Sequence, residues 1–201
     1  MKKEIKLNLG CGVHLFEGFI NVDNSFSLKD LTDKKGIYGL SKIDKDAEFI
    51  QADMCKLPIK DNTVDYIECL EAIEHVPYMK VEKAVREMHR VLKPGGKTVI
   101  FTTDFDDIAK MWVDFIANKD FNPLEWFTMV SVIYGNQLTS GEHHRAAFNT
   151  AYLNGLMQTC GFKDFTIVIY PRGAFPPKFR GAKWPEKAMA TGMILIEAVK
   201  S

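Results

Sequence analysis

Two hydrophobic periods alternate along the chain. Alternating apolar and polar residues predict a strand at 5–9, and other short segments rich in apolar residues predict strands at 19–23, 48–53, 64–70, 97–103, 165–170 and 193–199. Apolar residues at helical spacing predict helices over 81–92, with Pro94-Gly95-Gly96 as the stop signal, and over 151–159. Strands that alternate with helices predict an α/β protein whose sheet is mostly parallel and covered by helices.

The stretch 104–150 has a less regular pattern. We expect it to be a helical or lid insertion over the sheet of a single domain spanning 1–201, and such segments commonly carry substrate contacts. Its aromatic side chains form either the core of the lid or the wall of a hydrophobic acceptor pocket. They are Trp112, Phe115, Phe121, Trp126, Phe127 and Tyr134.

Charge and composition narrow the functional class. The 26 Lys and Arg residues balance 26 Asp and Glu residues, so no basic surface for nucleic acid is expected. The apolar runs are shorter than the ~20 residues that span a bilayer, and the first residues lack the apolar core of a signal peptide. The four cysteines lie far apart, which is typical of a reducing compartment. We expect a cytoplasmic monomer or homodimer with no nucleic-acid or membrane partner.

Candidate ligand-binding residues follow the first three predicted strands. Ligands of an open parallel sheet bind beyond the carboxyl ends of its strands. Gly10 and Gly12 follow the first strand and allow close approach of the backbone to a ligand. Asp23 follows the second and suits two ribose hydroxyls, and Asp53 follows the third and suits an exocyclic amine such as that of adenine. This order predicts a nucleoside site, although each aspartate alone also suits a helix cap or a turn.

Dinucleotide binding is the competing use of such a sheet. It requires G-x-G-x-x-G at the start of a helix and an acidic residue about 20 positions later. Leu15 stands where the third glycine belongs, Asp23 comes too early, and 13–18 is too short for a full helix. An NAD-dependent oxidoreductase is therefore disfavoured.

Several segments resemble motifs of the Rossmann-like, S-adenosylmethionine-dependent methyltransferases, in the order typical of a small type 11-like subgroup. They are LNLGCG at 7–12, GFINVD at 18–23, DMCKLP at 53–58, DYI at 65–67, IEHV at 73–76 and RVLKPGG at 90–96. The resemblance covers 5–104 and implies a three-layer fold whose seven-stranded sheet has an antiparallel last strand. His14 departs from the pattern, because it replaces the third glycine of the usual G-x-G-x-G.

The same resemblance implies S-adenosylmethionine as the cofactor and a role for each strand end. The implied cofactor-binding residues are Gly10, Cys11 and Gly12 at the methionine part, Asp23 with its neighbour Asn24 at the ribose, Asp53 and Met54 at the adenine, and Cys69 and Leu70 under the sulfonium.

Four side chains are candidates for the region around the transferred methyl group: His144, Tyr134, His75 and Glu71. Methyl transfer is an in-line displacement that depends mainly on alignment, and a hydroxyl acceptor gains typically ~10²–10⁴-fold from a general base. We expect His144 to be that base or a positioning group, with a structural role as the alternative. His75 more readily fixes the helix after the fourth strand. No metal is expected, because adjacent His143 and His144 point apart.

The sequence thus predicts methyl transfer from S-adenosylmethionine to oxygen or nitrogen of a small-molecule acceptor. The alternative is a non-catalytic relative that binds S-adenosylmethionine or a partner.

Overall fold

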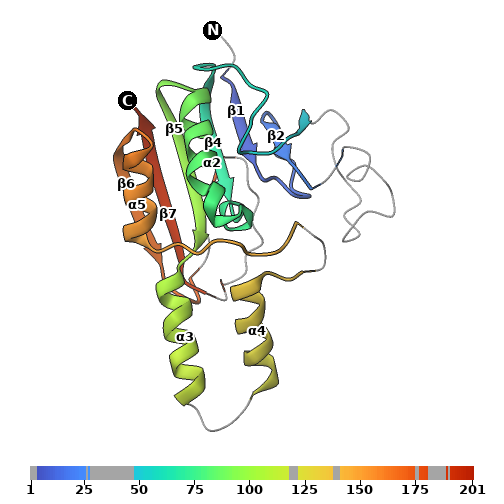
Figure 1. Cartoon of the computed structure of the whole chain (residues 1–201), viewed down its shortest axis with the longest axis vertical. Helices are drawn as coiled ribbons and strands as arrows, with labels where there is room; N and C mark the ends of the chain where they lie inside the picture. Colours follow the sequence, from blue (N-terminus) through green and yellow to red (C-terminus); the bar gives the residue numbers. More distant parts are fainter. Residues whose placement is uncertain are drawn as a thin grey trace.

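The fold is built on one seven-stranded sheet (Figure 1). In the computed structural model, the described residues are 4–25, 27, 48–117, 122–137, 141–174, 177–180, 189 and 191–201. The strands are β1 (Lys6–Leu9), β2 (Ile20–Asp23), β3 (Phe49–Gln51), β4 (Val64–Leu70), β5 (Leu92–Thr103), β6 (Phe162–Tyr170) and β7 (Met193–Lys200). Their order is β3-β2-β1-β4-β5-β7-β6, and every pairing is parallel except those of β7 with β5 and β6. The predicted Rossmann-like methyltransferase sheet is confirmed.

The two faces of the sheet are covered differently. On one face lie the 3-10 helix η2 (Ile73–His75) and the helices α2 (Tyr78–Val91) and α5 (Thr150–Thr159) (Figure 1). Helix α2 buries its apolar stripe there, including Val81, Val85 and Met88. The second hydrophobic cluster takes Phe16 and Phe19 from the connection between β1 and β2, and its described members include no helical residue.

Two strands begin three residues or more before their predicted starts, because glycine and aspartate allow strands to bulge. Helix α2 ends at Val91, and Pro94-Gly95-Gly96 lie within β5, where the β4–β5 register shifts. Strand β6 begins at Phe162 instead of 165, and its register with β7 shifts between Lys163 and Thr166. Asp164 lies in this irregularity with φ +52°, a conformation that Asp adopts more readily than most residues.

Two helices occupy much of the stretch 104–150. Helices α3 (Phe105–Ala117) and α4 (Pro123–Tyr134) lie side by side and extend from the lower end of the sheet in Figure 1. The rings of Trp112, Phe115 and Trp126 pack together with centroids 5.8–6.4 Å apart. The start of α4 could have been predicted from the sequence, because Asn122 followed by Pro123 is typical of a helix N-terminus. In the structure the Asn122 side chain accepts a hydrogen bond from Leu124 N at 3.0 Å. Phe121 lies outside the described residues.

The connection between β1 and β2 contains turns and no helix. Asn21 is fully buried and organises it: its Oδ1 accepts from Phe16 N at 2.8 Å and from Asn8 Nδ2 at 2.9 Å. Its Nδ2 donates to the carbonyls of Phe16, Phe19 and Glu48 at 3.1–3.3 Å. The Asn21 amide thus bonds backbone N–H and C=O groups of this connection that would bond to one another if the connection were a helix.

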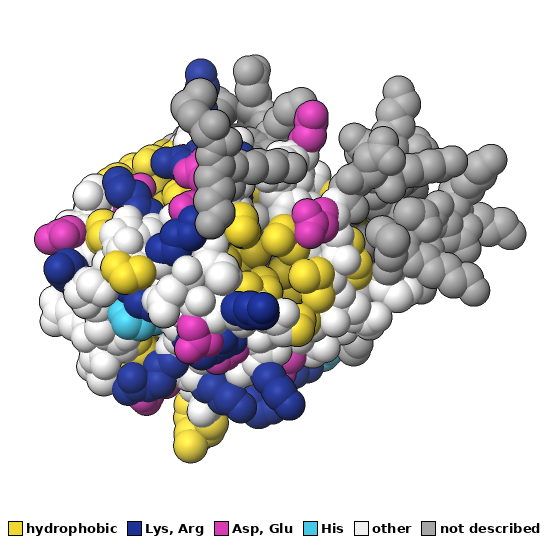
Figure 2. Space-filling view, turned by 90° about the horizontal axis from the view of Figure 1, so that it is seen from above, with side chains coloured by type: hydrophobic (Ala, Val, Ile, Leu, Met, Phe, Trp, Pro, Cys, Tyr) yellow, Lys and Arg dark blue, Asp and Glu magenta, His cyan; other side chains and the backbone are white. Residues whose placement is uncertain are grey.

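Charges of both signs are mixed on the surface. Figure 2 shows the end of the molecule that is uppermost in Figure 1, where Lys and Arg side chains are interspersed with Asp and Glu. Ion pairs such as Arg90 with Glu87 and Lys97 with Glu197 accompany this mixture. Within the described ranges, no helix is both long and apolar enough to cross a bilayer.

Replacing Asn21 by alanine is expected to lower the free energy of unfolding by about 1–3 kcal/mol, because buried polar partners lose their hydrogen bonds. Urea unfolding followed by circular dichroism measures the change. Asn154→Ala, on the outer part of α5 where the side chain accepts a long 3.4 Å bond from Gln158, is the matched control. Equal losses in the two variants would contradict the role given to Asn21.

Gly10→Ala is expected to destabilise the protein by about 1–3 kcal/mol more than Gly12→Ala, because a Cβ at residue 10 overpacks the interior. That Cβ would overlap Ala72 Cβ and lie 3.2 Å from Met54 Cε, whereas a Cβ at Gly12 meets nothing within 4 Å. Both glycines have positive φ (+69° and +51°), so the backbone strain largely cancels in the comparison. The unfolding midpoints of the two variants measure the difference in stability. Similar midpoints would show that Ala72 moves away from the added Cβ at little cost in free energy.

Candidate active site

A pocket of about 1170 Å³ lies at the carboxyl ends of the parallel strands. It is next to the pairing of β1 with β4, where the strand order reverses, which is the usual ligand site of such sheets. A pocket for one drug-sized ligand measures roughly 300–1,000 Å³. The volume therefore leaves room for two small molecules together.

One half of the pocket is built from the turn after β1. The backbone N–H groups of Gly10 and Cys11 both donate to Val22 O, at 2.8 and 3.1 Å, which binds the turn to β2. Gly12 N donates to Asp23 Oδ2 at 2.8 Å. Because nothing lies within 4 Å of the position of a Cβ at Gly12, the backbone there is open to a ligand.

The two strand-end aspartates act as turn formers and still have acceptor capacity. Asp23 Oδ1 accepts from Ser25 N at 2.7 Å, and Asp53 Oδ1 accepts from Cys55 N at 2.8 Å. An ionised carboxylate offers about four lone-pair sites, so Asp23, with one N–H on each oxygen, retains sites for two further donors. The turn and ligand interpretations of these residues are therefore compatible.

The other half of the pocket is built from the turn after β4. Glu71 lines it and is anchored by its N–H, which donates to Phe101 O at 2.7 Å. Glu74 is 2% exposed, and its Oε2 accepts from Thr102 Oγ1 at 3.0 Å. Burial raises the pKa of both carboxyls to about 7, and for Glu71 the nearby Glu74 adds to the effect. Solvent reaches Glu71 from the pocket while protein atoms surround its other sides.

The segment 141–146 crosses the pocket and ties η2 to α4. Arg145 N and Ala146 N donate to Glu74 O at 2.7 and 3.1 Å, and His144 N donates to Tyr134 O at 3.1 Å. The rings of His75 and His144 meet edge to face with centroids 4.9 Å apart. Their Nδ1 atoms lie 3.1 Å from His143 O and 2.8 Å from Val132 O, respectively. Because carbonyl oxygens only accept, the contact with Val132 O places a hydrogen on Nδ1 of His144 and leaves the lone pair on its Nε2 in the neutral ring, whereas the ring of His75 has the carbonyls of both His143 and Glu71 beside it.

Burial lowers the pKa of both histidines. For His144, the neighbouring His75 lowers the pKa further, and the bond to Val132 O opposes the shift. For His75, the bond to His143 O partly offsets burial. Both rings are therefore neutral near pH 7.

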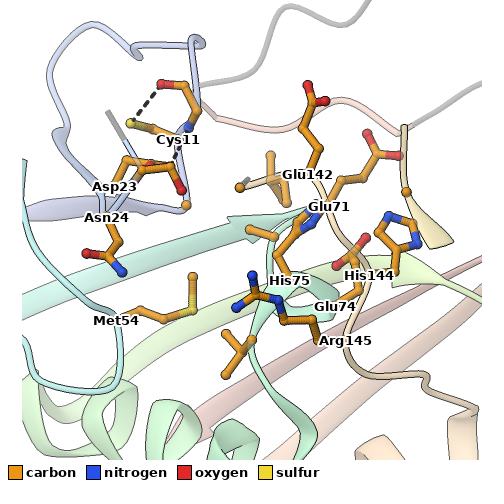
Figure 3. A pocket seen from close by; sticks show the side chains of 18 of the residues that line it. Cys11, Asp23, Asn24, Met54, Glu71, Glu74, His75, Glu142, His144 and Arg145 are labelled. Atoms are coloured by element: carbon orange, nitrogen blue, oxygen red, sulfur yellow. Dashed lines mark hydrogen bonds between the residues drawn. The ribbon is translucent and has the colours of Figure 1, made fainter. Parts of the chain in front are cut away.

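The structure brings most of the predicted site residues to this pocket. Its wall includes Gly10, Cys11, Gly12, Asp23, Asn24, Asp53, Met54, Leu70, His75 and His144. Figure 3 shows Cys11, Asp23, Asn24 and Met54 on one side, and Glu71, Glu74, His75, Glu142, His144 and Arg145 on the other. We call these the glycine half and the carboxylate half.

Two of the predicted residues do not line this pocket. Cys69 is wholly buried in the core, because it is the inward-facing residue of β4 one position before the pocket. Tyr134 is 56% exposed at the end of α4, and only its carbonyl acts near the site, by accepting from His144 N. The described aromatic residues of α3 and α4 do not line the pocket either, so the hypothesis of an aromatic acceptor wall fails for them.

Sequence reasoning missed Glu142 and Arg145 and gave Glu74 no role in the pocket wall. Their signal was the charged and polar run Glu142-His143-His144-Arg145, which directly precedes the apolar Ala146-Ala147-Phe148. In the part of the chain that the structure describes, no group of three or more His, Cys, Asp or Glu residues is arranged to hold a metal ion.

Comparisons with known proteins agree with this geometry. Residues 7–100 match the family model described as a methyltransferase domain. An uncharacterized protein of Methanocaldococcus jannaschii is 32% identical over 68% of this chain and 59% of its own length. Demethylmenaquinone methyltransferase of Staphylococcus epidermidis is 26% identical over 63% of this chain and 52% of its own length. The chain thus spans little more than half the length of these relatives.

A solved structure from Thermotoga maritima, described as an S-adenosylmethionine-dependent methyltransferase and possible histamine N-methyltransferase, covers 100% of this chain with a TM-score of 0.60. The match covers 84% of that protein at 18% identity, so it supports the fold alone. The family model, the sheet order and the strand-end motifs agree. Residues 7–100 therefore match the methyltransferase family, and the sheet has the Rossmann-like fold of the class I methyltransferases, which use S-adenosylmethionine.

Proposed function

We propose that this pocket binds S-adenosylmethionine in its glycine half and methylates a small molecule held in its carboxylate half. The observation that carries the proposal is that Gly12, Asp23 and Asp53 line the same pocket as Glu71 and His144, with Asp23 on the opposite side from Glu71 and His144 in Figure 3. Residues 104–150 contribute to the acceptor side through α4 and the segment 141–145. We also propose that residues 1–201 form a single domain.

The residues of the glycine half fit the cofactor chemically. The open backbone at Gly12 suits the methionine part, and the spare acceptor sites of Asp23 suit the two ribose hydroxyls. Asp53 and Met54 line the wall where the adenine would lie. When bound, the cofactor supplies an electrophilic methyl group, so the protein needs mainly to align an acceptor and exclude water. Such alignment is worth on the order of 7–11 kcal/mol of a barrier.

His144 is suited to orient the acceptor and, where the acceptor is a hydroxyl, to receive its proton. Its Nδ1–H is held by Val132 O, which fixes the ring and leaves the Nε2 lone pair as the basic site. A neutral imidazole near pH 7 is an effective general base. His75, held by His143 O and packed edge to face on His144, acts as a positioning residue.

The names of relatives support a small-molecule acceptor. The Staphylococcus epidermidis relative is named for demethylmenaquinone and another, from Rauvolfia serpentina, for norajmaline, and both are small molecules.

Calorimetric titration with S-adenosylmethionine, S-adenosylhomocysteine and NAD tests the function directly. We expect both sulfur compounds to bind and NAD to give no heat, with radiolabelled methyl transfer to a small-molecule acceptor panel as the activity readout. Binding without transfer to any acceptor would favour the non-catalytic relative. Binding of NAD alone would overturn the assignment of the pocket.

Asp53→Ala is expected to weaken S-adenosylhomocysteine binding by about 1–3 kcal/mol, because a buried hydrogen bond to the adenine amine is lost. Asp114→Ala, on the exposed side of α3, is the control and should leave the affinity unchanged. Both are measured by calorimetry, with the melting temperature recorded to detect loss of the turn at Cys55. Unchanged affinity in a folded Asp53→Ala protein would place the adenine elsewhere.

A further inference from the structure

The carboxylate half of the pocket carries more acidic than basic groups. Its ionisable side chains are Glu71, Glu74, Glu142, His75, His144 and Arg145. Both histidines are neutral near pH 7 because burial lowers their pKa. Three carboxyl groups and one guanidinium therefore remain as the ionisable groups that carry charge here, with Glu71 and Glu74 partly ionised near pH 7 because their pKa is raised to about 7, although the chain as a whole has a net charge of zero. Such a wall attracts a cationic group and repels an anionic one.

Among these residues, Glu71 has an unusual backbone conformation and a carboxylate that is available to a ligand. Its φ of +47° is uncommon for any residue with a side chain, and its N–H is fixed to Phe101 O. This conformation directs the carboxylate into the pocket, as Figure 3 shows. Among the described residues, no hydrogen-bond donor to that carboxylate is found. Strained backbone that presents an unpaired group in a ligand site points to a functional role for the group.

The surroundings of Glu71 favour the uptake of a proton. Burial and the nearby Glu74 raise its pKa to about 7, so the carboxyl exchanges its proton readily near neutral pH. Glu74 is itself nearly fully buried and accepts from Thr102. A cation placed between these two carboxyls would relieve their repulsion.

We propose that the acceptor is an amine, bound as its ammonium cation against Glu71, and that Glu71 removes the proton that blocks the nitrogen lone pair. This inference rests on the proposed function, since it names the acceptor class of the same pocket. The ammonium N–H bond breaks, and its proton goes to a Glu71 oxygen. The nitrogen lone pair then forms the new bond to the methyl carbon, while the carbon–sulfur bond breaks and its electron pair remains on sulfur. Glu71 later releases its proton to solvent, and the product leaves as the methylated ammonium.

The geometry distinguishes an amine from other acceptors. A carboxylate or phosphate acceptor would meet Glu71 and Glu142 with like charge, which is unfavourable. A neutral hydroxyl gains no attraction from the excess of carboxyls. The rings of Trp112, Phe115 and Trp126 pack on one another outside the pocket wall, so they form no aromatic cage for the cation.

The test uses the whole chain saturated with S-adenosylhomocysteine and matched ligands that share one skeleton. The first triplet is benzylamine, benzyl alcohol and benzoate, and the second is hexylamine, hexanol and hexanoate. Calorimetry at about pH 7.5 is expected to show that each amine binds about tenfold or more tightly than the alcohol and the carboxylate of the same skeleton. A difference of this size corresponds to the free energy of one hydrogen bond to a charged group. Radiolabelled methyl transfer should follow the same order.

Two substitutions locate the preference at Glu71. Glu71→Gln keeps the size of the side chain, and Glu71→Gly relieves the positive φ, so at least one is expected to fold as stably as the wild type. Each should lose most of the amine preference while its affinity for S-adenosylhomocysteine stays unchanged. Glu82→Gln, on the exposed side of α2, is the matched control and should keep the preference.

The outcomes are separable. Tighter binding of an alcohol or carboxylate, an intact amine preference in both Glu71 variants, or no binding by any ligand would overturn the amine proposal. If the wild-type chain does not bind S-adenosylhomocysteine, the proposed function itself is wrong, independently of the amine proposal.

Discussion

The contact between Gly10 and Ala72 is the constraint on which the pocket depends. Gly10 directly follows β1 and Ala72 directly precedes η2, and the absence of a Cβ at Gly10 lets the two backbones approach until they are separated only by the Ala72 methyl. Because β1 and β4 are hydrogen-bonded neighbours, this approach brings the turn after each strand to the same cavity. Any larger residue at position 10 would separate the glycine half from the carboxylate half.

The two halves differ in chemistry because different elements build them. The glycine half is made of backbone and short side chains that follow β1, β2 and β3, and its hydrogen bonds join neighbours such as Gly12 and Asp23. The carboxylate half depends on long-range contacts, in which Arg145 and Ala146 donate to Glu74 from far along the chain. A loop held in this way can vary in sequence without disturbing the sheet, which is the usual route by which one fold serves many acceptors.

Asn21 stabilises the connection between β1 and β2, which contains no helix. Its amide occupies the centre of the connection and bonds to Phe16, Phe19, Asn8 and Glu48. Phe16 and Phe19 then cover a sheet face on which the described residues form no helix. The short connection is therefore held by a buried polar network and by aromatic packing, both of which are visible in the sequence only as single residues.

Prediction from the sequence succeeded where local chemistry decides the structure. Short segments rich in apolar residues located all seven strands, and the positions of Gly10, Asp23 and Asp53 relative to strand ends placed them at one edge of the sheet. It failed where distant contacts decide. Helix α4 is apolar on most of its surface, so its period was hidden although Asn122-Pro123 marked its start.

The sequence by itself determined the sheet and the glycine half, because strand periodicity and turn residues act over a few positions. Tertiary structure alone decided which side chains complete the carboxylate half. Tyr134 turned outward and Cys69 entered the core, while Glu142 and Arg145 reached the pocket through the crossing segment. The reason is that these positions depend on packing between elements more than sixty residues apart, such as the bonds of Glu74 to Arg145 and of His75 to His143.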